Sequence, residues 1–128
     1  MLDDKEIDKL CHGRLVYADV YDSAGRGPAG VHWLVLIDSD QQIRNSDTYR
    51  VVGISHNKDI DPDFCIPVPR RIGLDGFIVC SWQPAVDLPG IKKIGQRLFT
   101  PEMNAILELV QKATAERKRQ QKASGKKK

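Results

Sequence analysis

A few histidine, hydroxyl and guanidinium side chains are the groups in this sequence that could do chemistry. His32 opens an apolar run directly after a glycine-rich segment, and an imidazole there can pass protons near neutral pH. Ser55 and His56 end another apolar run, where a serine hydroxyl can donate a hydrogen bond to a phosphate oxygen. Taken alone, both places are better explained as strand ends, with His32 packed against Trp33.

Other side chains could contact a nucleic acid. Arg26 lies in the glycine-rich segment, Arg70 and Arg71 precede a glycine-containing turn, and any of the three guanidiniums could hold a phosphate. Ser81 and Trp82 end a further apolar run, where an indole ring could stack on a base. Isolated arginines are usually solvated, however, and a tryptophan in such a position more often belongs to the core or to a subunit interface.

The sequence contains no metal or cofactor motif. Cys11, Cys65 and Cys80 form no C-x-x-C pair, the histidines are not at helical spacing, and no phosphate-binding loop or dinucleotide fingerprint is present. We therefore expect no metal and no cofactor. Unpaired cysteines, a charged N-terminus and the lack of an apolar run near the roughly 20 residues of a membrane helix predict a cytoplasmic protein without a membrane segment.

The positive charge of the chain is concentrated at its C-terminal end. The net charge is +3, but residues 117–128 hold seven basic residues and no acidic ones, so the rest has 13 basic against 17 acidic residues, or −4. The body is mildly acidic, which argues against a nucleic-acid footprint over the whole surface. The basic end could bind RNA weakly or simply keep the protein soluble.

The elements that must position these groups are mostly strands. A short helix is predicted over residues 3–11, capped by Asp3 or Asp4, and a firm C-terminal helix begins with Thr100 as its N-cap. Residues 117–128 lack apolar periodicity and are predicted to be disordered. About five strands are predicted, over residues 14–22, 31–38, 49–55, 64–69 and 76–82. This pattern predicts one mostly β domain over residues 1–116, a small antiparallel barrel.

From Gly13 to Pro101 the order of these segments resembles the MazF/PemK-like ribonuclease toxins. Members of that family open with a glycine, a strand, a glycine-rich loop and a strand that begins with Arg-Pro, a place taken here by His32-Trp33. Ser55 stands where the family's third strand ends in Thr-Ser or Ser-Thr. Further matches in order are Gly76 to Cys80, Asp87 and the Ile94-Gly95 pair before the last helix.

The resemblance implies an SH3-like barrel and an RNA-cleaving chemistry that needs no metal. In the family an arginine and a threonine stabilise phosphate charge and shuttle protons while a ribose 2′-hydroxyl attacks the adjacent phosphorus. On this chain His32 would act as general acid or base and Ser55 as phosphate hydrogen-bond donor, with Arg26 or Arg70 as charge clamp. Other members use an Arg and an Asp in a later strand, where this chain has Val79 and Ser81.

The resemblance also implies partners. It predicts a homodimeric toxin of a type II toxin–antitoxin system, acting on single-stranded RNA and neutralised by an antitoxin protein. The chemistry of the residues themselves suggests His56, Arg71, Ser81 and Trp82 as further RNA contacts. Since the family's arginine is missing, the alternative is a catalytically inactive barrel that binds RNA or a peptide. A third hypothesis is an interaction domain whose basic tail does the binding.

Overall fold

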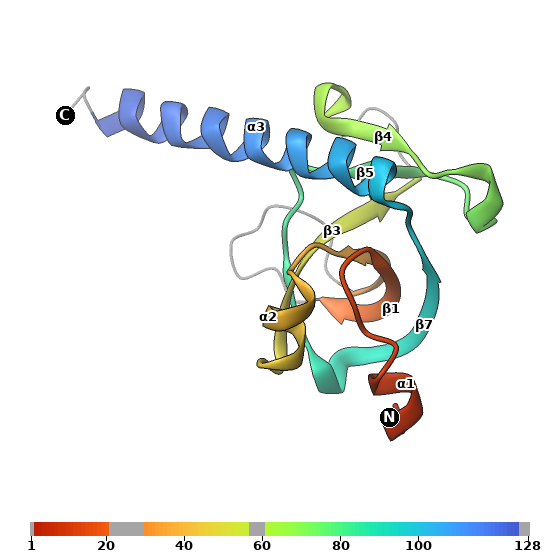
Figure 1. The fold of residues 1–128 in the computed structure, drawn as a ribbon. Coiled ribbons are helices and arrows are strands. Elements are labelled where there is room, and N and C mark those ends of the chain that lie inside the picture. Colours follow the sequence, from red (N-terminus) through yellow and green to blue (C-terminus); the bar gives the residue numbers. More distant parts are fainter. Residues whose placement is uncertain (1, 21–29, 57–60, 126–128) are drawn as a thin grey trace.

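One strongly curved antiparallel sheet, covered by a long helix, makes up the body of the protein (Figure 1). The computed structural model describes residues 2–20, 30–56 and 61–125, and side chains as far as residue 120. The strands are β1 (Arg14–Val20), β2 (Gly30–Leu36), β3 (Thr48–Ser55), β4 (Cys65–Pro67), β5 (Phe77–Val79), β6 (Ala85–Asp87) and β7 (Ile91–Arg97). The helices are α1 (Asp4–Ile7), α2 (Asp40–Arg44) and α3 (Thr100–Gly125), with short 3₁₀ turns η1 (Pro62–Phe64), η2 (Arg70–Ile72) and η3 (Leu88–Gly90).

Strand β3 is the branch point of the sheet. The strand order is β4-β5-β3-β2-β1-β7, and β6 pairs separately with the beginning of β3. Along β3, Thr48–Arg50 pair with β6, Val51–Gly53 with β2, and Gly53–Ser55 with β5. The expected mostly antiparallel fold with a C-terminal helix is confirmed. The sheet is not a closed barrel, however, because β4 and β7 remain its two edges among the described residues.

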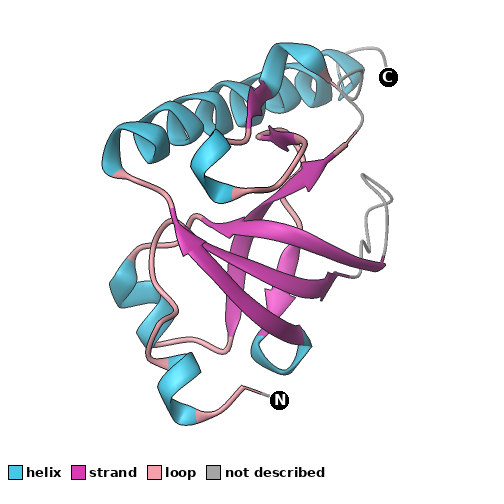
Figure 2. Ribbon diagram, turned by 90° about the vertical axis from the view of Figure 1, so that its right-hand side faces the viewer, coloured by secondary structure: helices cyan, strands magenta, loops and turns pink. Residues whose placement is uncertain are grey.

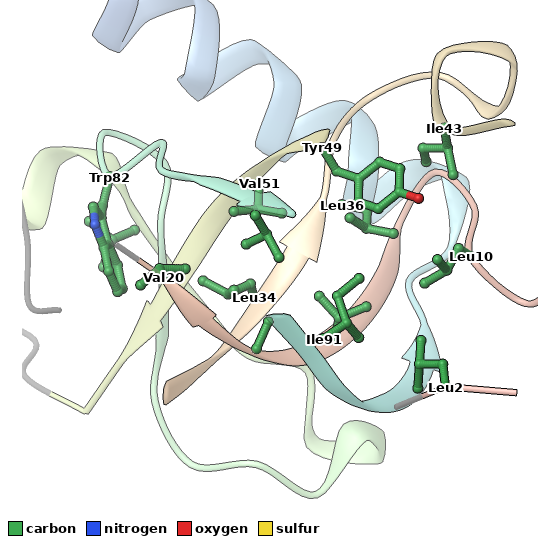
Figure 3. Close-up of a cluster of buried hydrophobic side chains, with 14 residues drawn as sticks. Leu2, Leu10, Val20, Leu34, Leu36, Ile43, Tyr49, Val51, Trp82 and Ile91 are labelled. Carbon is green, nitrogen blue, oxygen red and sulfur yellow. The ribbon is translucent and has the colours of Figure 1, made fainter. Parts of the chain in front are cut away.

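The sheet is buried on both faces. On the inner face, Leu34 and Leu36 of β2 pack with Val51 and Trp82 in the cluster drawn in Figure 3. On the other face, Val35 belongs to a second cluster, which α3 completes as it lies across the sheet (Figure 2). The buried side chains of α3 are Met103, Ile106, Val110 and Ala113. This double burial explains the apolar second half of β2, since Leu34, Val35 and Leu36 are hidden from water on both faces of the strand.

The helices at the two ends of the chain differ in length from those predicted from the sequence. Helix α1 is shorter than predicted, but its cap is confirmed, because Asp3 and Glu6 form a reciprocal capping box. Helix α3 continues to Gly125, which corrects the predicted disorder of residues 117–128 for all but the last three, which lie outside the described residues. The run after residue 110 is rich in good helix formers, and Arg117 donates a hydrogen bond to the carbonyl of Ser81 at 2.9 Å.

Helix α3 begins one residue earlier than predicted, and a side chain of its own first turn caps it. The carbonyl of Phe99 accepts from the amide of Met103, so Phe99 rather than Thr100 is the N-cap. The carboxylate of Glu102 accepts the Phe99 amide at 2.7 Å and two bonds from Arg71, at 2.6 and 2.8 Å. The guanidinium of Arg71 also lies 3.7 Å from the centroid of the exposed Phe99 ring. These contacts join η2 to the start of α3.

The carboxylate of Glu102 should make stability depend on pH. Partial burial acts to raise the pKa of Glu102, but the Phe99 amide and the Arg71 guanidinium outweigh it and hold that pKa below its ordinary value of 4.5. The stabilisation is therefore complete above pH 4.5 and is lost as pH falls toward the lower folded-state pKa. We expect Glu102→Gln to be less stable than wild type at neutral pH and to converge with it in acid, measured by urea unfolding. Glu108→Gln, which removes an exposed carboxylate of the same helix, should not change this pH dependence.

Candidate active site

The main candidate site lies where β2 and β3 diverge. These strands pair from Leu36 opposite Val51 to Leu34 opposite Gly53. Beyond that pair the end of β3 stays paired with β5 on its other edge, while the start of β2 stays paired with β1. The residues that follow the last pair line a cleft of about 610 Å³. The cleft thus opens where β2 and β3 stop pairing with each other.

Three of the side chains predicted from the sequence meet at this cleft. His32 comes from β2, Ser55 is the last residue of β3, and His56 follows it. Position 55 lies on the same face of β3 as Tyr49 and Val51, both members of the inner cluster, because alternate residues of a strand share a face. The remaining lining residues are Tyr17, Val31, Trp33, Ile54, Leu74 and Asp75.

The ring of Trp82 packs against the ring of His32. The two rings meet edge to face, with centroids 5.2 Å apart and planes at 87°. Trp82 is only 4% exposed and lies directly on Gly53, where an added Cβ would be 1.7 Å from the indole ring. Its buried ring therefore has no free face for a base, which corrects the suggestion that Trp82 stacks on RNA. The alternative drawn from the sequence, a core tryptophan, is confirmed.

A second aromatic pair forms another wall of the cleft. The rings of Tyr17 and Trp33 lie 5.2 Å apart at 45°, and Trp33 packs over Gly95, where an added Cβ would be 2.9 Å from the ring. The ammonium of Lys93 lies 5.7 Å from the centroid of the Tyr17 ring. Both rings are half-buried, so this pair offers aromatic surface to a ligand.

No protein-family model and no curated protein sequence matches this chain. Solved structures do match it. MazF from Deinococcus radiodurans matches with a TM-score of 0.70 at 12% identity, covering 83% of this chain and 96% of that one. An endoribonuclease from a mycobacterial species, in complex with its cognate antitoxin, matches at 0.67 with 11% identity, covering 83% and 95%. The Mycobacterium tuberculosis toxin MazF-mt6 matches at 0.63 with 12% identity, covering 80% and 97%.

This chain has the MazF fold. At these identities the likeness establishes the arrangement of the chain and not its chemistry. The resemblance noted in the sequence is therefore confirmed for the fold. The places that the resemblance assigned to His32 and Ser55 fall together at one cleft of that fold.

The arginines predicted as charge clamps are not brought to the cleft by the described structure. Arg26 lies outside the described residues. Arg71 is held by Glu102 and Phe99, and the exposed Arg70, on η2, is not among the residues that line the cleft. Among the described lining residues the ionisable groups are two imidazoles, one phenol and the carboxylate of Asp75.

The other positions considered from the sequence are buried or take part in contacts that stabilise the fold. Ser81 is half-buried, and its carbonyl accepts the hydrogen bond from Arg117. Val79, at the place of the family's later arginine, is fully buried. Burial, with a smaller effect from Cys65, raises the pKa of the Cys80 thiol to about 12, so it stays protonated and is not a nucleophile.

Two further findings concern ligands and membranes. Within the described ranges, no three or more His, Cys, Asp or Glu side chains are grouped so that they could hold a metal ion. No helix among the residues described is both long and apolar enough to cross a membrane.

Sequence reasoning missed Tyr17, Asp75 and Lys93 at or near the cleft. Tyr17 was part of a plainly alternating strand, and only pairing with β7 shows that Lys93 lies opposite it. Asp75 belongs to the segment between η2 and β5, whose position depends on the fold. Strand β7 was missed because residues 91–97 do not alternate between apolar and polar and include two adjacent exposed lysines.

Adding a side chain at Gly53 should disturb the support of His32. An alanine Cβ would collide with the Trp82 ring, and such overpacking costs about 1–3 kcal/mol. We expect Gly53→Ala to lower the free energy of unfolding in urea by about this amount and to shift the tryptophan emission of the folded protein. Gly90→Ala is the matched control, because its Cβ would meet only the Asp19 carbonyl, at 3.2 Å. Equal stability of the two variants would contradict the role given to Trp82.

Proposed function

We propose that this protein is a MazF-like endoribonuclease toxin that cleaves single-stranded RNA without a metal ion. The observation that carries the proposal is the meeting of His32 and Ser55 at the cleft between β2 and β3 of a MazF-fold chain. The three solved structures described above are a MazF, a mycobacterial endoribonuclease with its antitoxin, and a MazF toxin. By the same likeness we propose a homodimer in the cytoplasm, inhibited by an antitoxin protein.

The cleft offers the groups that an internal transfer of the phosphate requires. One imidazole, which we assign to His32, takes the proton of a ribose 2′-hydroxyl, and the 2′ oxygen forms a bond to the adjacent phosphorus. The bond from phosphorus to the 5′ oxygen breaks, and a second imidazole, that of His56, returns a proton to the leaving oxygen. The products are a cyclic phosphate and a 5′-hydroxyl. Ser55 donates a hydrogen bond to a phosphate oxygen as charge develops there.

The aromatic wall supports RNA as the substrate. The Tyr17 and Trp33 rings provide stacking surface beside the two imidazoles, and stacking on aromatic side chains holds single-stranded bases with little sequence preference. Lys93 is the described cation that contacts this wall, and its ammonium can neutralise a neighbouring phosphate. RNA would then be held by base stacking and positioned by phosphate contacts.

A binding function without catalysis is the second candidate. It is favoured by the lining of the cleft, which within the described structure contains Asp75 but no arginine or lysine. Neutralising the charge of the pentavalent phosphate is usually a large part of catalysis. A barrel with this cleft could bind RNA or a peptide and leave it intact.

The first test is cleavage of a long single-stranded RNA in EDTA. We expect cleavage to persist in EDTA and to leave cyclic phosphate ends, because the mechanism uses only protein side chains. The ends are identified by mass spectrometry before and after acid opening of the ring. Cleavage that stops in EDTA and returns with magnesium contradicts the mechanism, whereas RNA binding without cleavage supports the second candidate.

Loss of the His32 imidazole should remove most of the activity. General acid–base catalysis contributes about 10²- to 10⁴-fold, so we expect His32→Ala and His32→Gln to lower kcat by that factor in single-turnover assays. His32→Gln retains bulk against Trp82 and separates catalysis from packing. The control is His12→Ala, because the His12 ring bonds the Asp38 carbonyl and does not line the cleft. Full activity in His32→Gln would show that His32 is only a packing residue.

A further inference from the structure

A second cavity lies at the opposite end of β3 from the cleft. It has a volume of about 470 Å³, within the range of small-molecule sites, and it shares no lining residue with the cleft. Its walls come from α1, the segment after α1, α2 and its flanking residues, the start of β3, and η3. The apolar lining residues are Ile7, Leu10, Ile43 and Leu88.

The charged groups of this cavity are mainly acidic. Asp8, Asp40 and Asp47 line it, against the single guanidinium of Arg44. The carboxylate of Asp40 already accepts the backbone amide of His12 at 2.8 Å. Asp8 and Asp47 are exposed, so they lie toward the mouth of the cavity rather than its floor. An apolar space with an acidic mouth suits a molecule that is apolar at one end and positive at the other.

Tyr49 is a buried polar group directed into the same cavity. Its side chain is 2% exposed, and its hydroxyl points between Ile43 and Leu10, two lining residues, in Figure 3. Within the described part of the chain no hydrogen bond is formed by this hydroxyl. Burial, and to a smaller extent the charge of Asp47, raise the pKa of Tyr49, so the phenol is neutral at physiological pH. Because the hydroxyl faces the cavity it can be reached from there, and a ligand in the cavity would offer it a hydrogen bond.

We propose that this cavity binds a small organic cation, an amine or guanidine with a compact apolar body. The apolar body lies among Ile7, Leu10, Ile43 and Leu88. The cationic group lies beside Asp47 and donates a hydrogen bond to the Tyr49 oxygen. The site is independent of RNA cleavage, so it stands or falls separately from the proposed ribonuclease function.

Benzylamine is a suitable probe, with benzyl alcohol as its neutral match. Both have the same aromatic body, and only the amine carries a positive charge. We expect benzylamine to cause saturable amide chemical-shift changes in the full-length protein, concentrated in α1, α2 and the start of β3. Benzyl alcohol at the same concentration should cause much smaller ones. Absence of saturable changes, or equal changes with the two compounds, would overturn the proposal.

Two variants identify the groups that hold the cation. Asp47→Asn should raise the Kd of benzylamine about twofold to fivefold, the range for exposed ion pairs. Asp63→Asn, which removes an exposed carboxylate outside the cavity, should leave the Kd unchanged. Equal weakening in both variants would show non-specific attraction to an acidic surface and would overturn the proposal.

Tyr49→Phe keeps the ring and removes only the hydroxyl. It should raise the Kd about tenfold, the loss of a hydrogen bond to a charged group. Its thermal midpoint should equal or exceed that of wild type, because the lost hydroxyl has no partner among the described residues. A clear loss of stability, or an unchanged Kd, would show that the hydroxyl serves the fold and not a ligand.

Discussion

The packing of Trp82 on Gly53 is the contact on which the architecture of the cleft depends. The ring occupies the space that any other residue at position 53 would fill, at the residue of β3 that pairs with both β2 and β5. The Gly53 amide also bonds the Trp82 carbonyl at 3.1 Å, so the backbone and the ring of Trp82 are fixed to the same point. His32 rests edge-on against this ring. A single glycine thus connects the branching of the sheet to the placement of an imidazole.

The second constraint is the double burial of β2. Since one face of the strand packs into the inner cluster and the other under α3, its register on β1 and β3 cannot slip without exposing apolar side chains. His32 and Trp33 extend this register beyond the last pair with β3, and therefore emerge on opposite faces of the strand at the cleft. Both residues stay paired with β1, opposite Ala18 and Tyr17, and this pairing orders the cleft wall.

The sequence predicted the elements whose patterns are local, and failed where a residue's role depends on a distant partner. The alternation of β1, the apolar run of β2 and the α3 stripe all follow from burial periodicity. The clustering of His32 with Ser55 came from the family resemblance, because nothing local indicates that β2 and β3 diverge there. The role of Arg71 was missed for the same reason, since its partner Glu102 is far along the chain. Trp82 appeared available for stacking because the residue on which it packs is Gly53. A glycine has no side chain and so gives no apolar signal in the sequence.

The inner face of β3 joins the two candidate sites. Tyr49, Val51, Gly53 and Ser55 alternate along the strand and so share that face. The four residues have different roles. Tyr49 lines one cavity with its phenol, and Val51 lies in the core. Gly53 leaves a space that Trp82 fills, and Ser55 places a hydroxyl at the cleft. The core between them is close-packed, and a displacement of Trp82 or Val51 by a ligand at one end would be resisted rather than transmitted. The two sites are therefore expected to act independently although one strand carries both.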